Sequence, residues 1–315
     1  MINLVLDDGS NFIKIAYRNK DNSITTHAFA SRVIRKAVPS TTLTGLSAAS
    51  YEIDGDRYTV SKTAVDTIPT DNRTYQTSFH NRVLIQHGIR YVLDQLGTDE
   101  EFVNVMVTLP VGQFFNPDGT KNEQLIEKKI QNVKGHVKNL GGNKTVKIES
   151  CYVMPEGVPA FTHVKNELRL TGSRYLLADI GGTTTDLVVI NDQDQIEQFQ
   201  SLNLGALKML SKFSTLVSEK LNLSGLTDEL AVNGLLSGMV AGDDVSDIVT
   251  MVLKDFQSTV NDEIARLGEL RLFDAVIYSG GGANLLSSTY VDVLKSKEPQ
   301  FDNALGALAI MDTIE

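Results

Sequence analysis

The chain has only one cysteine, Cys151, among its 315 residues. A single thiol cannot form an internal disulfide, so a fold held together by disulfides is excluded. Cys151 lies in an apolar run just before Met154. We therefore expect a buried, unreactive thiol in a reducing cytoplasm.

Positive charge and long apolar runs are also scarce. Lysine and arginine number 29 against 39 acidic residues, which gives a net charge of -10 and a pI near 5.0. Duplex binding draws on clustered Lys and Arg, so direct DNA binding is not expected. No stretch of about 18 uncharged apolar residues is present to span a bilayer, and the start Met1-Ile2-Asn3-Leu4 lacks the basic segment of a signal peptide. We expect a cytoplasmic protein without membrane contact.

Several familiar site motifs are missing. No Walker A sequence is present: the segment from Gly135 to Lys144 lacks the Gly-Lys-Ser/Thr order, and its Gly141-Gly142-Asn143 is typical of a hairpin turn. The dinucleotide pattern G-x-G-x-x-G is absent too. The five histidines are scattered, and although His80 and His87 can share a helix face, no third ligand lies near them in sequence. A zinc site is therefore not predicted.

The most informative segment that is present is an acidic turn, Asp7-Asp8-Gly9-Ser10. Leu4-Val5-Leu6 enters it as a buried strand and Ile13-Lys14-Ile15 leaves it as an alternating one, so a β-hairpin is predicted. The tip residues Asp8, Gly9, Ser10 and Asn11 offer backbone N–H groups and a hydroxyl that can wrap a phosphate, and Lys14 adds a positive charge. Asp7 cannot contact phosphate directly, which implies a hydrated Mg²⁺ between them.

A second turn, from Asp179 to Asp186, repeats this arrangement. Tyr175 to Ala178 reads as a strand, and Leu187 to Ile190 as the return strand. Gly181 and Gly182 permit close backbone approach, while Thr183, Thr184 and Thr185 supply hydroxyls. Asp7 and Asp179, arriving from opposite turns, would hold one Mg²⁺ through water. Either turn alone is equally typical of an ordinary Asp-Gly hairpin.

A third glycine cluster comprises Gly280, Gly281 and Gly282, followed by Ala283 and Asn284. It follows Phe273 to Tyr278, which has the composition of a core strand. Glycines without side chains let the backbone lie flat against a planar or anionic ligand, and Asn284 is expected to cap a helix that it opens with Leu285 and Leu286. The alternative is a simple turn between a strand and a helix.

Hydrophobic periodicity predicts the remaining elements. Strands are expected at residues 24–29, 51–60 (a hairpin around Asp54-Gly55), 102–109 and 146–154, and helices at 81–96, 123–133, 206–221, 245–267 and 301–309. Residues 31–50 are expected to be irregular. Strand triples followed by helices occur twice, which predicts a duplicated α/β unit with mostly parallel sheets. With 42% hydrophobic residues, the chain can fill two cores.

The order of these motifs resembles the actin, Hsp70 and sugar-kinase ATPase superfamily. The segments Val107-Thr108-Leu109-Pro110, Asn122 to Lys129, Val153-Met154-Pro155-Glu156 and Leu177 to Asp186 are similar to the plasmid-segregating bacterial actins called ParM, and the likeness covers nearly the whole chain. The resemblance implies an α/β actin-like ATPase fold, with two related α/β domains and a nucleotide cleft between them. Domain I would comprise residues 1–165 plus 299–315, and domain II residues 166–298. The helix at 301–309 would form one strap of the hinge; alternatively, it is an ordinary terminal helix.

Glu156 is the strongest candidate for the chemical step. It follows Pro155, which restricts the backbone before it, and lies where the chain is expected to cross between the two halves. A carboxylate there can orient and partly deprotonate the water that attacks the γ-phosphate, while Asp7, Asp179, Lys14 and Mg²⁺ supply the electrostatic part. Alternatively, Glu156 is a helix-start acid placed there by the helix dipole.

Three functions are compatible with this reading. The ParM resemblance implies a filament-forming ATPase that adds copies of itself head to tail with Mg-ATP, loosens on hydrolysis and reaches plasmid DNA through a DNA-binding adaptor of the ParR type. A small-molecule kinase of the same superfamily would need a larger substrate domain. A nucleotide-gated scaffold would need a partner-binding module, and the chain stops soon after its last nucleotide motif. Glycines do not distinguish adenine from guanine, so the sequence allows GTP as well as ATP.

Overall fold

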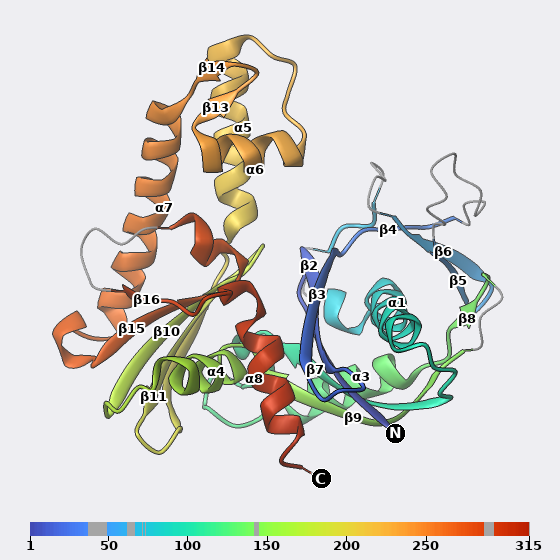
Figure 1. The fold of residues 1–315 in the computed structure, drawn as a ribbon. Helices are drawn as coiled ribbons and strands as arrows, with labels where there is room; N and C mark the ends of the chain where they lie inside the picture. Colours follow the sequence, from blue (N-terminus) through green and yellow to red (C-terminus); the bar gives the residue numbers. More distant parts are fainter. Residues whose placement is uncertain are drawn as a thin grey trace. The chain divides into compact units, whose positions relative to one another are not determined.

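The computed structural model describes residues 1–36, 49–61, 67–70, 72, 74–141, 145–286 and 293–314. The chain forms two compact units (Figure 1). The first unit is Met1–His163 with Phe301–Glu315, and the second is Val164–Gln300. Helix α4 (Val158–Leu168) carries the chain from one unit to the other. In the described part of the chain, no helix is both long and apolar enough to span a membrane.

The first unit is built on a five-stranded sheet in the order β3-β2-β1-β7-β9. Its strands are β1 (Ile2–Asp8), β2 (Phe12–Arg18), β3 (Ile24–Ala30), β7 (Phe102–Leu109) and β9 (Lys147–Pro155). A smaller four-stranded sheet comprises β4 (Val33–Ile34), β6 (Asp56–Val60), β5 (Ala49–Ile53) and β8 (Lys138–Asn139). The helices are η1 (Tyr75–Thr77), α1 (Phe79–Leu96), α2 (Val111–Phe114), α3 (Glu123–Lys134) and α8 (Asp302–Met311).

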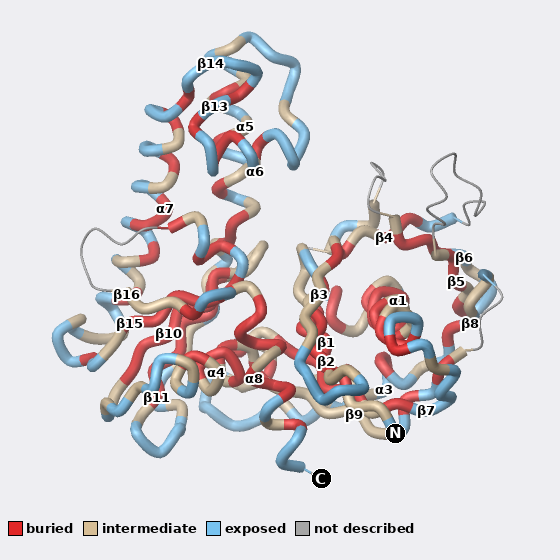
Figure 2. Tube along the Cα trace, viewed as in Figure 1, coloured by how far each residue is buried: buried red, intermediate tan, exposed pale blue. Residues whose placement is uncertain are grey.

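Side-chain alternation along β1 decides what covers each face of this sheet. Leu4 and Leu6 face the large core that α1 and α3 complete, whereas Val5 faces a smaller core shared with α8. In the central strands, residues 4–8 of β1 and 105–109 of β7 are accordingly all buried (red in Figure 2). As a consequence, the two adjacent acids that end β1 point to opposite faces of the sheet.

The second unit repeats the plan, with a sheet in the order β12-β11-β10-β15-β16. Its strands are β10 (Arg174–Ile180), β11 (Thr185–Asn191), β12 (Ile196–Leu202), β15 (Ala275–Ser279) and β16 (Val293–Leu294), with a two-stranded ribbon of β13 (Met239–Val240) and β14 (Asp243–Asp244). The helices are α5 (Ala206–Leu221), α6 (Asp228–Ser237), α7 (Ser246–Leu267), η2 (Leu270–Leu272), η3 (Gly281–Leu285) and η4 (Pro299–Phe301). Helices α5 and α7 pack through an apolar stripe that includes Phe213 and Phe256.

Most predicted elements are confirmed within two residues, but the strand pairing is not mostly parallel. Each five-stranded sheet has two antiparallel and two parallel pairings, because a three-stranded meander supplies the two antiparallel ones. The region 31–50 also contains β4 and the start of β5, while residues 37–48 lie outside the described residues. The turn expected at Gly141-Gly142-Asn143 falls largely on residues 142–144, which are outside them too.

Cys151 lies on β9 and is half-buried against the larger core of the first unit. Burial raises the pKa of its thiol to about 12. Because the thiolate is the reactive form, this environment suits the unreactive thiol that the sequence predicts.

Candidate functional site

Side chains of the first unit fix the first acidic turn by donating hydrogen bonds to its backbone carbonyls. The carbonyl oxygens of Asp8, Gly9 and Ser10 all accept hydrogen bonds from side chains of the same unit. The donors are Gln76 Nε2 to Asp8 O (3.4 Å), Ser31 Oγ (2.7 Å) and Tyr75 OH (3.2 Å) to Gly9 O, and Thr70 Oγ1 to Ser10 O (2.6 Å). Tyr75 is completely buried, and burial raises the pKa of its hydroxyl, which therefore stays a neutral donor.

This arrangement determines where the N–H groups of the turn point. In a planar trans peptide the C=O and the following N–H point in opposite directions. Because the carbonyls of residues 8, 9 and 10 point into the unit, the N–H groups of Gly9, Ser10 and Asn11 point away from it. Successive outward N–H groups of this kind form an anion-binding concavity.

Asp7 lies beside this turn with its charge partly balanced. Its carboxylate pairs with Lys14 Nζ at 2.8 Å, across the β1–β2 register, and accepts a hydrogen bond from Thr108 Oγ1 at 3.0 Å. Asp7 is 2% exposed, and Lys14 remains partly accessible. The structure therefore groups Asp7, Lys14 and the turn at one edge of the sheet.

Asp8 is a different case, and its predicted role in ligand binding does not extend to its side chain. That carboxylate is fully buried on the opposite face of the sheet, where it pairs with Lys129 and accepts a hydrogen bond from Asn81 Nδ2 at 2.7 Å. The physical reason is the period of two along a strand, which separates adjacent side chains. Only the backbone of Asp8 belongs to the turn.

The second turn is held in the same way, but by a helix. The first two N–H groups of α5, from Ala206 and Leu207, donate to the carbonyls of Gly181 and Gly182 at 2.9 Å each. By the same peptide geometry, the N–H groups of Gly182 and Thr183 point away from α5. Gly181 N also donates to Thr184 O at 2.9 Å, which closes the turn.

Asp179 and Asp186 face each other across the β10–β11 register. Side chains directly opposite in an antiparallel pair share a face, with Cβ atoms roughly 4.5–5.5 Å apart, and like charges there repel. Both residues are almost fully buried. Asp186 accepts hydrogen bonds from Ser201 and Thr184, and this turn has no lysine in the position that Lys14 takes in the first. Two facing carboxylates therefore suit a bound cation, and the donor set fits Mg²⁺, which prefers carboxylates and water.

The third glycine cluster packs against the end of β10. A Cβ added at Gly280 would lie 2.4 Å from Asp179 Oδ1, and one at Gly282 would lie 2.4 Å from Ile180 Cγ2, whereas Gly281 has nothing within 4 Å. Two of the three glycines thus serve internal packing, and Gly281 alone faces open space. Ala283 is fully buried beside them.

The prediction that Asn284 caps the start of a helix is wrong. A 3-10 helix runs from Gly281 to Leu285, its N-cap is Gly280, and Asn284 lies inside it. Gly280 has φ 80°, a left-handed conformation that glycine adopts without strain, and this lets the helix begin immediately after β15. Lys295 Nζ donates to Ala283 O at 2.7 Å and also to Leu286 O, so it caps the other end.

Glu156 lies at the same sheet edge as Asp7. Its N–H donates to Leu109 O at 2.7 Å, directly after β9, and two strand spacings put the ends of β1 and β9 about 10 Å apart. Gly157, with φ 90°, turns the chain before α4 begins at Val158. Glu156 therefore lies two residues before α4, and the first turn of α4 itself contains no acid. Its role in hydrolysis and its role as an acid at the start of a helix both stay predictions.

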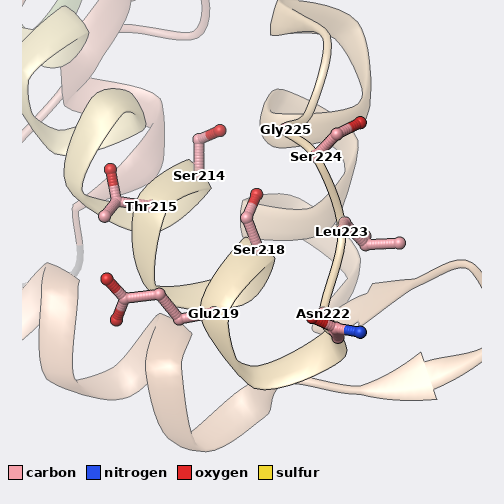
Figure 3. Close-up of a pocket in the computed structure, with 8 residues that line it drawn as sticks. All are labelled: Ser214, Thr215, Ser218, Glu219, Asn222, Leu223, Ser224 and Gly225. Atoms are coloured by element: carbon pink, nitrogen blue, oxygen red, sulfur yellow. The ribbon is translucent and has the colours of Figure 1, made fainter.

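Two surface pockets in the described part of the chain lie away from these turns. One, of about 380 Å³, lies at the C-terminal end of α5 and is lined by the hydroxyls of Ser214, Thr215, Ser218 and Ser224 with Glu219 (Figure 3). Its nearest lining residue on α5, Ser214, lies about 12 Å along the helix axis from Ala206, whose N–H holds the second turn. The other, of about 350 Å³, is lined by Arg169, Tyr175 and Asp274 at the opposite edge of that sheet. No predicted site residue lines either one.

Gly205 provides a steric test of the second turn. Its φ of -139° suits any residue, but an added Cβ would lie 2.3 Å from Gly182 O. We expect Gly205→Ala to displace the start of α5 and to lower the free energy of unfolding by about 1–3 kcal/mol, measured by urea denaturation. Gly281→Ala, whose Cβ meets nothing within 4 Å, is the matched control. Equal stability of the two variants would show that α5 does not depend on this close contact.

Comparison with solved structures shows the class of fold. An archaeal actin homolog in complex with ADP is 21% identical, with a TM-score of 0.75, and the alignment covers 99% of this chain and 100% of that one. A 15-stranded ParM filament from Clostridium botulinum gives 20% identity, a TM-score of 0.74 and 99% coverage of both chains. Bacillus thuringiensis ParM with ATP gives 14% identity, a TM-score of 0.69 and 100% coverage of both. The protein has the two-unit α/β fold of the actin homologs, as the sequence predicted.

The family is equally clear. The family described as plasmid segregation protein ParM, N-terminal, matches residues 2–167, more than half of the 315 residues. The chain belongs to this family, which confirms the resemblance seen in the sequence. No curated protein matches it.

Four residues that sequence reasoning did not assign contribute to these turns. Thr108 and Lys129 support the first turn, Asp186 faces Asp179, and Lys295 caps the glycine segment. Burial lowers the pKa of Lys295. Asp186 could have been found, because the hairpin register implied by Asp179 and the turn places it opposite. The other three come from distant segments and leave no local pattern.

Proposed function

We propose that this protein is an actin-like ATPase that binds Mg-ATP through both acidic turns and polymerises into filaments. The observation that carries the proposal is the shared geometry of the turns. In each, the carbonyls accept hydrogen bonds from the same unit, the N–H groups point outward, and a buried aspartate is the next-to-last residue of the preceding strand. Outward N–H groups beside a carboxylate suit a magnesium triphosphate.

The proposed roles follow from position. The N–H groups of residues 9–11 and 182–183 bind phosphate oxygens, with Lys14 and the hydroxyls of Ser10, Thr183 and Thr184 beside them. Asp7 and Asp179 hold the magnesium ion through water. A magnesium ion held there would neutralise the charge that develops in phosphoryl transfer. Glu156 orients the attacking water, and the segment Gly280 to Asn284, with Gly281 open, lies against the base.

The proposed assembly and partners rest on relatives. One solved relative is described as a 15-stranded ParM filament, another as ParM with ATP, and the archaeal homolog as a complex with ADP. By extension, we propose that this chain binds ATP, assembles into a filament in the cytoplasm and segregates plasmid DNA. With a net charge of -10, the chain is poorly suited to grip DNA itself, so we propose a separate DNA-binding adaptor of the ParR type.

Light scattering tests the proposal directly. Adding Mg-ATP is expected to give a rise followed by a decay as hydrolysis loosens the polymer, with filaments visible by electron microscopy at the maximum. ADP, or ATP with EDTA, is the control and should give no sustained rise. GTP is assayed in parallel. No rise together with phosphate transfer to a sugar would indicate a small-molecule kinase, and nucleotide binding with neither result would indicate a nucleotide-gated scaffold.

A further inference from the structure

A fully buried lysine lies directly behind the first acidic turn. Lys129, on α3, has no exposed surface, and its Nζ contacts Asp8 Oδ2, Gln76 Oε1 and Asn81 Oδ1, the last at 3.2 Å. A buried ammonium is costly unless it is paired and hydrogen-bonded, and here each of its three protons has an acceptor. Such a group constrains the orientation of whatever it binds.

Lys129 reaches the turn by two routes. Through the first, its bond to Gln76 Oε1 orients that amide so that Nε2 faces the carbonyl of Asp8 at 3.4 Å. That carbonyl belongs to the peptide whose N–H, on Gly9, points outward. Lys129 therefore acts on the direction of the first N–H group of the turn.

The second route leads to Asp7. Asp8, paired with Lys129, accepts the backbone N–H of Thr108 at 3.1 Å through its other oxygen. The hydroxyl of the same Thr108 donates to Asp7 Oδ1 at 3.0 Å. A continuous chain of bonds thus joins Lys129 to the carboxylate proposed to hold magnesium, and every side chain in it is at most 4% exposed.

We infer that Lys129 is a positioning residue for the nucleotide: through Gln76, Asp8 and Thr108 it fixes the first phosphate turn and Asp7 in the orientation that binds a magnesium nucleotide. This inference rests on the proposed function. It assigns Lys129 no contact with the ligand.

The test is the affinity for Mg-ADP and Mg-ATP, measured by titration calorimetry on the full chain, together with urea unfolding. Lys129→Met keeps the length of the side chain but removes the charge and its donors. We expect its dissociation constants to rise at least about tenfold, as for loss of a residue that orients a ligand-binding group. Lys128→Met, at the adjacent exposed position, is the matched control and should bind as the wild type does.

Two further variants separate positioning from loss of stability. Leu93→Ala removes a buried side chain of the same core, distant in sequence from the turn, and should destabilise the unit without weakening nucleotide binding. The double variant Asp8→Asn with Lys129→Met removes both buried charges. It should recover much of the lost stability yet still bind at least about tenfold more weakly, because Gln76 stays unoriented. The double variant also serves as the test if Lys129→Met alone does not fold.

The outcomes are distinct. Affinity loss confined to the variants that lack Lys129 supports the inference. Wild-type affinity in those variants, or an affinity that simply follows stability across all of them and Leu93→Ala, overturns it while leaving the proposed function intact. If the wild type itself binds neither nucleotide, the proposed function fails and the inference fails with it.

Discussion

Replacing Glu156 with glutamine is expected to slow phosphate release from ATP at least about tenfold, at the low end for loss of a general base. Binding should change little, because the amide has the same shape and the N–H of residue 156 keeps its bond to Leu109 O. The expected result is therefore a lower kcat with nearly unchanged affinity, which separates a role in orienting water from a role in binding. Phosphate release is measured at saturating Mg-ATP, and affinity by calorimetry.

A carboxylate at the opposite end of the same strand provides the control for this experiment. Glu149 lies near the N-terminal end of β9 and is exposed, whereas Glu156 follows the C-terminal end. Glu149→Gln should hydrolyse ATP at the wild-type rate. Unchanged turnover in Glu156→Gln would remove Glu156 from the mechanism and leave the binding roles of the turns untouched. In light scattering, polymer formed by Glu156→Gln should decay more slowly, since hydrolysis is proposed to loosen it.

The second large effect is expected at Asp179. Asp179→Asn should weaken binding of the magnesium nucleotide by about 10–100-fold, the usual range for residues that orient a metal. The charge of the facing pair then falls to that of Asp186 alone, so a divalent cation loses half of its carboxylate attraction in this unit. Calorimetry with and without magnesium measures the effect, which should be largest when the metal is present.

Here too a matched variant is available. Asp192 lies in the exposed turn after β11 and has no part in the site, so Asp192→Asn should bind the magnesium nucleotide as the wild type does. If Asp179→Asn weakened binding equally with and without magnesium, Asp179 would be supporting the turn and not the metal. Gly280 also bears on the position of Asp179, because a Cβ at residue 280 would lie 2.4 Å from Asp179 Oδ1 and would displace the carboxylate.

Both expected effects depend on how the turns are held as well as on their sequence. The first turn is held by side chains from η1, α3 and neighbouring loops, and the second by the start of α5. The two units reach the same result, outward N–H groups beside a strand-end aspartate, through different donors. Because side chains hold the first turn, substituting a side chain such as Lys129 tests it. Because backbone N–H groups of α5 hold the second turn, it is tested by adding a Cβ at Gly205, where α5 and the turn are in close contact.

The sequence alone determined the local structure around each turn. Short apolar runs ending in Asp-x-Gly predicted the hairpins β1–β2 and β10–β11, and the stripe from Val245 to Leu267 predicted α7, because these signals lie within a few residues of one another. The family resemblance also followed from motifs that are contiguous in the chain. By contrast, the prediction of mostly parallel sheets was wrong. The hydrophobic pattern of a strand does not indicate which strands pair with it or in which direction.

Only the tertiary structure decided what each acid does. Asp7 and Asp8 are adjacent and chemically identical, yet one faces Lys14 at the sheet edge while the other is buried against Lys129, 121 residues away. Both carboxylates are buried, and strand alternation separates them, but the partner that each one meets depends on the segments packed on its face. In the same way, Asn284 reads as a helix cap in sequence and lies within a 3-10 helix in the fold, because Gly280 begins that helix earlier. Local pattern sets the elements, and contacts between distant segments set the environment that gives each side chain its chemistry.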